Sequence, residues 1–238
     1  MKFRTLLVVL LMASIITING QDQGHGDVIH RAKNVHAGNL IRVTFHNNGR
    51  LGSVKGDQSV AYTGEWPIGS GKVQMGNTSL YVSSELRVSK GINSETGKEE
   101  FEFIVPTIFC EGWDPNIFSH DVLGRFQGFE PLPGYLNLQQ KEKDPGNAVA
   151  MSQMPFTWPP YWPDKLEDKG APGWRNSWNG YFGKDQKNAD EESYFVLDDY
   201  QFDKKLKGLD LPRPIPVEPK RGGLGLRLAV RGLQWSNP

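Results

Sequence analysis

The sequence has one cysteine, no excess of charge of either sign and few long apolar runs. The single cysteine, Cys110, excludes a disulfide within the chain, and we interpret it as a small buried side chain rather than a reactive thiol. Basic and acidic residues balance at 27 each, which leaves no basic field for a phosphate backbone. We therefore expect no nucleic-acid partner. Frequent proline and glycine exclude an architecture of long helices.

The one long apolar run lies at the N-terminus and is too short to span a bilayer. It covers the thirteen residues 6–18, whereas a membrane helix needs roughly 20. Lys2 and Arg4 precede it, and Asn19-Gly20 end it before a polar stretch. This layout predicts a cleavable signal peptide over residues 1–20, with no transmembrane segment left after cleavage. The alternative is that the run forms a buried N-terminal helix.

Cleavage after Gly20 would leave 25 basic against 27 acidic residues, a net charge near −2. An exported chain without disulfides is typical of a bacterial envelope. We therefore expect the protein in the periplasm, on the outer cell surface or outside the cell.

Alternating side chains predict β-strands in the first half of the chain. Asn48-Gly49 is a strong hairpin signal, and we expect paired strands over Asn39–His46 and Arg50–Lys55. A half-buried strand is expected over Ser79–Lys90, forming a long hairpin with Glu100–Pro106.

From about residue 108 to residue 183 the periodicity disappears. Ten of the sixteen prolines lie between Pro106 and Pro172, and five of the seven tryptophans lie between Trp113 and Trp178. Proline excludes regular sheet there, while the many aromatic rings argue against disorder. We expect a long, ordered, irregular insert.

Alternation returns at the end of the chain. Short strands are expected over Ser193–Asp198 and over Gly223–Gly232, where leucines and Val230 share one face. The predicted fold is all-β, mainly antiparallel and sandwich-like, with few short helices. We expect an extended polar segment over 21–38, then one β-rich domain over 39–238 that continues beyond the given C-terminus.

Several patches of the sequence form a recognisable set: Arg31–Asn39, Gly64–Pro67, Asn176–Gly183, Asp190–Tyr194, Gly223–Leu226 and Gly232–Ser236. Together they resemble the N-terminal part of a family of large, uncharacterised exported proteins of Bacteroidetes-like and Ignavibacteria-like bacteria. Members of this family often continue with fibronectin-type modules and a type IX sorting domain. The resemblance covers most of residues 31–236 and implies export and surface location, but no catalytic residue.

The insert concentrates the residues that could bind a ligand. Exposed aromatic rings stack on the apolar faces of sugars, and neighbouring prolines hold such rings apart. The insert is therefore a candidate platform for a glycan or a peptide. The alternative is that the same rings form a core that replaces missing secondary structure. The candidate ligand-binding residues are Trp158, Tyr161, Trp162, Trp174, Trp178 and Tyr181.

Acidic residues around the strand predicted over Ser193–Asp198 suggest a metal site. Calcium takes six to eight oxygen ligands, and Asp198-Asp199 beside a turn could supply some of them. No calcium-loop spacing is present, so the alternative is a solvated acidic face balanced by nearby lysines. Apart from calcium, we expect no cofactor. Four histidines are dispersed and lack the spacing of a dedicated metal site: His25, His30, His36 and His46.

Other catalytic signatures are missing. Gly69-Ser70-Gly71-Lys72 lacks the flanking residues of a phosphate loop and is interpreted as a tight turn between strands. No G-x-S-x-G motif occurs. Four carboxylates in irregular segments could still meet in space as a hydrolase pair: Glu65, Glu111, Asp114 and Glu130.

Two functions remain open from the sequence. The first is an exported envelope or cell-surface protein with a structural, adhesive or ligand-binding role, whose partner is a glycan or an envelope protein. The second is an extracellular polysaccharide-active enzyme of the glycoside hydrolase type. A pair of carboxylates in a tryptophan-lined cleft would favour the second.

Overall fold

The computed structural model describes residues 24–52, 62–76, 78–104, 107–109, 128–201, 205–206, 209–210 and 223–236. The predicted signal peptide and Cys110 lie outside these residues. Within them, no helix is both long and apolar enough to cross a membrane.

The described residues form short strands, one short α-helix and a few 3₁₀ turns. The strands are β1 (Lys33–His36), β2 (Arg42–His46), β3 (Thr63–Glu65), β4 (Tyr81–Ser83), β5 (Leu86–Ile92), β6 (Glu99–Ile104), β7 (Thr107–Phe109), β8 (Glu130–Pro131), β9 (Asn179–Gly180), β10 (Gly183–Lys184), β11 (Glu191–Asp198), β12 (Lys205–Leu206), β13 (Leu209–Asp210) and β14 (Arg227–Gln234). The helix is α1 (Leu138–Lys143), and the 3₁₀ turns are η1 (Val28–His30), η2 (Pro155–Thr157), η3 (Pro163–Lys165) and η4 (Pro172–Trp174). The strands pair antiparallel, which confirms the predicted all-β, mainly antiparallel fold with few short helices. The sandwich-like stacking stays a prediction.

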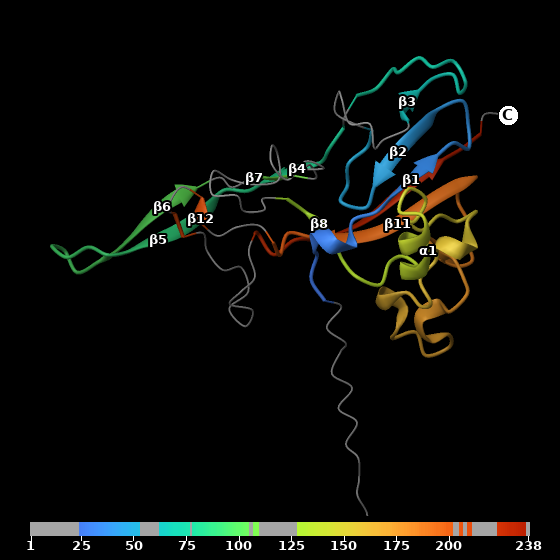
Figure 1. Ribbon diagram of the computed structural model, residues 1–238. Coiled ribbons are helices and arrows are strands. Elements are labelled where there is room, and N and C mark those ends of the chain that lie inside the picture. The colour runs from blue at the N-terminus through green and yellow to red at the C-terminus, as the bar shows by residue number, and fades with distance from the viewer. Residues whose placement is uncertain are drawn as a thin grey trace, which may run out of the picture.

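Strand β2 is the middle of a three-stranded sheet, between β1 and β3 (Figure 1). The predicted Asn48-Gly49 turn follows β2, and its glycine has a φ of 90°, which costs glycine no steric strain. The partner strand predicted over 50–55 is reduced to a bridge between Phe45 and Leu51, and residues 53–55 lie outside the described range. Strand β1, within the segment predicted only as extended, takes the place of that partner.

Strand β11 is central to the fold. It pairs with β14 from Glu191 opposite Gln234 to Asp198 opposite Arg227, and its other edge pairs with β8. Seven of its eight residues are buried, so packed layers cover both of its faces. The strand predicted over Ser193–Asp198 is therefore confirmed, and it begins two residues earlier.

The two faces of β11 contribute to two different hydrophobic clusters, because successive strand side chains point in opposite directions. The first cluster joins β11 to β2, with Phe45 and Phe195 stacked at 6.3 Å between ring centroids. It comprises Ala32, Phe45, Ile108, Phe129, Leu136, Ala148, Val149, Met151, Phe195 and Leu197. The second joins β11 to the insert and comprises Leu132, Tyr135, Ala150, Trp162, Trp178, Tyr194 and Val196.

The alternating C-terminal segment packs as predicted. Strand β14 begins at Arg227, four residues after the predicted start at Gly223. Its apolar side chains and those just before it pack against the first cluster, which confirms the predicted apolar face. These side chains are Leu224, Leu226, Leu228 and Val230.

The long strand predicted over Ser79–Lys90 is divided in two. Strand β4 pairs with β7, whereas β5 pairs with β6, so Ser84-Glu85 interrupts the ladder. The predicted hairpin is confirmed by the β5–β6 pairing, and it extends away from the sheets that contain β2 and β11 (Figure 1). On its expected apolar face, Phe101 and Phe103 are exposed.

The described part of the insert, residues 128–183, contains the irregular structure that proline predicts. Its elements are two to six residues long, and prolines begin η2, η3 and η4. Proline suits a first turn because its missing N–H has no partner there and its φ is already fixed.

Candidate ligand-binding cleft

The tryptophans of the insert divide into core residues and partly exposed residues. Trp162 and Trp178 are 1% and 0% exposed, and their rings meet edge to face with centroids 5.6 Å apart. Trp158 and Trp174 are half-buried and pack against the same cluster. Trp162 and Trp178 therefore belong to the core and have no exposed face for a ligand. This was one of the two alternatives that the sequence left open for the aromatic residues.

Each of these indoles also has its polar atom satisfied within the protein. Trp162 donates to the Ser177 carbonyl at 2.8 Å, and Trp178 donates to Glu192 Oε2 at 2.7 Å. Buried polar groups without such partners are costly, so these bonds fix the ring orientations. Two similar bonds hold the half-buried rings: Trp158 Nε1 to the Met151 carbonyl at 2.7 Å, and Trp174 Nε1 to Asp168 Oδ2 at 2.6 Å.

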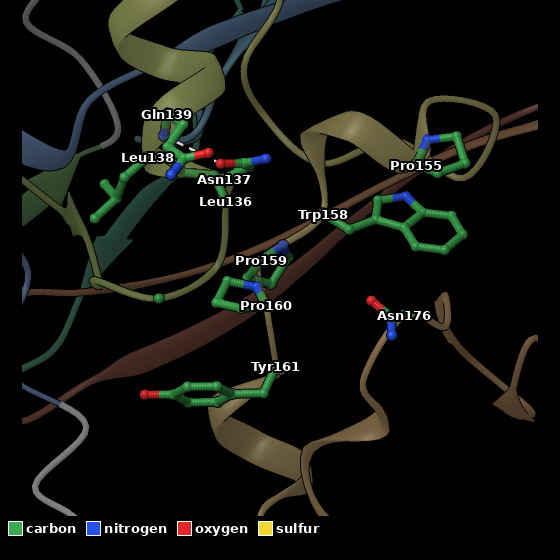
Figure 2. Close-up of a pocket in the computed structure, with 11 residues that line it drawn as sticks. Leu136, Asn137, Leu138, Gln139, Pro155, Trp158, Pro159, Pro160, Tyr161 and Asn176 are labelled. Carbon is green, nitrogen blue, oxygen red and sulfur yellow. Dashed lines mark hydrogen bonds between the residues drawn. The ribbon is translucent and has the colours of Figure 1, made fainter.

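A cleft of about 720 Å³ opens beside the second cluster. It lies between the start of α1 and the Trp158–Tyr161 segment (Figure 2). The residues that line it are Gly134, Leu136, Asn137, Leu138, Gln139, Pro155, Trp158, Pro159, Pro160, Tyr161 and Asn176. The cleft thus includes two of the six candidate ligand-binding residues, Trp158 and Tyr161.

The aromatic rings of the cleft are spaced by a stiff segment. Pro159 and Pro160 lie between Trp158 and Tyr161, and in Figure 2 the two rings leave this segment in different directions. The Tyr161 ring is also contacted by the Arg175 guanidinium, 5.5 Å from the ring centroid. The rings therefore cannot sandwich a single small ring between them, but an extended ligand could contact both.

Amide side chains supply the polar groups of the cleft. Asn137 caps α1, since its Oδ1 accepts from the N–H of Gln139 at 3.0 Å and its Nδ2 donates to the Phe156 carbonyl at 2.8 Å. The side chains of Gln139 and Asn176 are exposed and have no hydrogen-bond partner among the described residues. Each of these two amides offers both donors and an acceptor to a ligand. No Asp, Glu, Lys or Arg is among the residues that line the cleft.

Gln139 and Asn176 were not predicted as site residues from the sequence. Asn176 has a φ of 56°, a conformation that asparagine tolerates better than most residues. Nothing in the local pattern indicates that Asn176 would line the same cleft as the start of α1, because their placement depends on the tertiary fold. The Asn137 cap was the available signal for a helix start there.

Tyr181 lies outside this cleft. It is 68% exposed and meets the equally exposed Phe182 edge to face, with centroids 5.0 Å apart. Together they border a different, smaller recess beside Arg231 of β14. The six candidate residues therefore lie in three places, and the structure brings only Trp158 and Tyr161 together as ligand-accessible rings.

The carboxylates proposed for calcium are buried and bind backbone groups. Asp198 Oδ1 accepts from the N–H of Gly26 at 3.0 Å and of Tyr200 at 3.1 Å. Asp199 accepts from the N–H of Leu224 at 2.6 Å and of Leu226 at 3.0 Å. Both residues are almost fully buried, so they do not form the alternative solvated face. Among the described residues, no group of three or more His, Cys, Asp or Glu could hold a metal ion.

The carboxylates considered for hydrolysis also have protein partners. Glu130 is paired with Arg31, whose Nε donates to Oε2 at 2.8 Å, and burial raises the pKa of Glu130 despite this pairing. Glu65 accepts from the N–H groups of Gly69 and Gly71 at 3.1 and 2.8 Å. The Gly69–Lys72 segment is thus a tight turn after β3, as predicted, and a carboxylate occupies the backbone donors that a phosphate would use. Glu111 and Asp114 lie outside the described residues.

One arrangement has the contacts of a Ser–His–acid triad without access for a substrate. His36 Nε2 lies 2.9 Å from Ser193 Oγ, and His36 Nδ1 lies 3.6 Å from Glu191 Oε2. Ser193 is only 1% exposed, and its Oγ also accepts from the N–H of Gly232 at 3.2 Å. A substrate carbonyl could not reach this oxygen, so the three side chains link β1 to β11 and β14 as a buried polar network.

Comparisons with known proteins add no relative: no family model, no curated protein and no solved structure matches the chain.

Proposed function

We propose that this chain is an exported bacterial envelope or cell-surface protein that binds an uncharged oligosaccharide in the Trp158–Tyr161 cleft. The observation that carries the proposal is the lining of the cleft, which combines aromatic and proline surfaces with free amide groups. A concave, mostly apolar site with a few convergent polar groups is the usual form of a small-ligand site. The predicted signal peptide and the family resemblance support the proposed location.

The polarity of the cleft favours a neutral sugar over a charged ligand. Gln139 and Asn176 can each donate to and accept from a hydroxyl group. An anionic sugar or a phosphate would need a cationic partner, and none lines the cleft. The two differently directed rings favour a chain of several sugar units, because one unit could not contact both.

The absence of carboxylates from the lining of the cleft favours binding over hydrolysis. A glycoside hydrolase needs two carboxyl groups about 5 to 10 Å apart at the scissile bond. The lining residues include no carboxylate. The cleft has the tryptophan expected for a glycoside hydrolase, Trp158, but not the pair of carboxylates. It therefore does not support the enzyme alternative.

The experiment is a titration of the chain from Gln21 onward, which retains every described residue, with three ligand sets. These are neutral oligosaccharides of increasing length, uronic-acid oligosaccharides and a proline-rich peptide. We expect a saturable change in tryptophan emission with neutral sugars only, and tighter binding as the chain lengthens. Saturation by the peptide alone would replace the proposal with peptide recognition, and no response to any neutral sugar would refute it.

A further inference from the structure

A second surface, separate from the cleft, is formed by two neighbouring turns. One turn connects β1 to β2, and the other follows β3. The large apolar side chains on these turns are 37% to 60% exposed. We name them the turn-tip patch: Leu40, Ile41, Trp66, Ile68 and Val73.

The two turns are bound to each other. The N–H of Ile68 donates to the Leu40 carbonyl at 3.0 Å. Arg42 and Glu65 pair across β2 and β3, which places both turns at the same end of the sheet (Figure 1). The exposed side chains therefore form one surface rather than scattered apolar residues, and such surfaces mark interaction sites.

The turns are also held in shape by polar contacts beneath the patch. Glu65 accepts from Gly69 and Gly71 and pairs with Arg42, whose Nε lies 2.9 Å from Glu65 Oε2. Asn39 Oδ1 accepts from the N–H of Ile41 at 2.7 Å. Little conformational freedom would be lost when the patch binds, because the turns are already ordered.

We propose that the turn-tip patch inserts into the interfacial region of a lipid bilayer. Residues 66–74 are all exposed, and Ile41 and Trp66 border a recess of about 320 Å³ together with Met75. Tryptophan prefers the membrane–water interface, and Leu or Ile beside it can enter the acyl boundary. The patch thus has the composition and exposure of an interfacial anchor.

One exposed charge on the two turns suits anionic lipid headgroups. In residues 38–42 and 64–76 the charged residues are Arg42, Glu65 and Lys72. Glu65 is buried and paired with Arg42, whereas Lys72 is exposed beside Val73 and can bind anionic phosphates. Two carboxylates beside the β1–β2 turn have protein partners: Glu191 accepts from the Ala37 N–H at 2.8 Å, and Asp190 accepts from the Ser236 N–H at 2.6 Å.

The test is co-sedimentation of the chain from Gln21 onward with vesicles of phosphatidylcholine alone or mixed with phosphatidylglycerol. We expect binding to both, stronger with phosphatidylglycerol. The Leu40→Ser/Trp66→Ser variant should lose about tenfold or more in vesicle affinity. A Lys72→Gln variant should lose only the preference for phosphatidylglycerol.

The control variant removes equally exposed apolar side chains elsewhere. Ile29 and Phe182 are 67% and 70% exposed, so the Ile29→Ser/Phe182→Ser variant should bind vesicles like the unaltered chain. Circular dichroism melting checks that each variant folds, and Leu40→Ser/Val73→Ser replaces the first variant if that one does not. Equal vesicle binding by patch and control variants would overturn the proposal. Absent vesicle binding by the unaltered chain would also overturn it. A dimer, detected by light scattering, that only the patch variants lose would then show that a second copy covers the patch.

Discussion

The indole N–H of Trp178 donates to Oε2 of Glu192 at 2.7 Å, and both side chains are completely buried. The same carboxylate accepts hydrogen bonds from the N–H of Asn188 and, at 3.0 Å, from the N–H of Ala189. It therefore organises the loop that leads into β11. This bond joins the irregular insert to the central strand. Trp178 also packs against the cleft residue Trp158, with ring centroids 5.8 Å apart, so the bond connects one wall of the cleft to β11.

Trp178→Phe removes the indole donor but keeps one aromatic ring in the core, so it tests the value of this bond. Trp178→Phe leaves a buried carboxylate with one partner fewer, which should cost about 1 to 3 kcal/mol of the free energy of unfolding. Urea denaturation measures it. Trp174→Phe is the control, since Trp174 is only half-buried and its partner Asp168 reaches solvent. An unchanged stability of Trp178→Phe would show that the bond does not hold the insert.

The buried Ser193–His36–Glu191 arrangement should stabilise the fold and not catalyse. Ser193→Ala removes the partner of both His36 and the Gly232 N–H, with an expected cost of about 1 to 3 kcal/mol. The unaltered chain should not react with a fluorophosphonate that labels active-site serines. Stoichiometric labelling at Ser193 would contradict this interpretation and show that β14 opens to admit a substrate.

The turn after β3 should depend on pH through Glu65. Hydrogen bonds from Gly71 and then Arg42 hold the pKa of Glu65 below its ordinary value of 4.5. A carboxyl with a lowered pKa stabilises the folded state above its unfolded pKa, and this contribution is lost as pH falls through the folded pKa. We expect amide-exchange protection of Gly69 and Gly71 at neutral pH that declines as the pH falls below the ordinary carboxyl value of 4.5.

The Glu65→Gln variant should have weaker protection at neutral pH and a flatter pH profile. Glu142→Gln serves as the control, because Glu142 is exposed on α1 and distant in sequence from the turn. Protection of Gly69 and Gly71 in the Glu65→Gln variant equal to that of the unaltered chain at every pH would show that another contact holds the turn.

Patterns that are local in the sequence predicted the fold best. Alternation identified β11 and the apolar face that Leu224 and Leu228 present to the core, because a period of two depends only on neighbouring residues. The division of the strand at Ser84-Glu85 was not predictable in this way. It depends on β4 and β5 pairing with different strands, which is a long-range choice.

The site was predicted only in part, for a physical reason. Sequence alone could not divide the six aromatic residues into core and surface, because burial depends on which strand covers them. Trp162 and Trp178 are covered by the face of β11 that carries Tyr194, whereas Tyr161 is not. The cleft amides Gln139 and Asn176 come from separate segments, and no spacing rule connects them.

The most direct test of the proposed function is calorimetric titration of the best neutral oligosaccharide into two matched variants. Gln139→Ala/Asn176→Gly removes both free amides, and glycine keeps the positive φ of Asn176 without strain. Glu142→Ala alters the same helix outside the cleft. We predict a loss of about tenfold or more in affinity for the first variant and none for the second. Equal affinity in both variants would contradict binding of the sugar in this cleft.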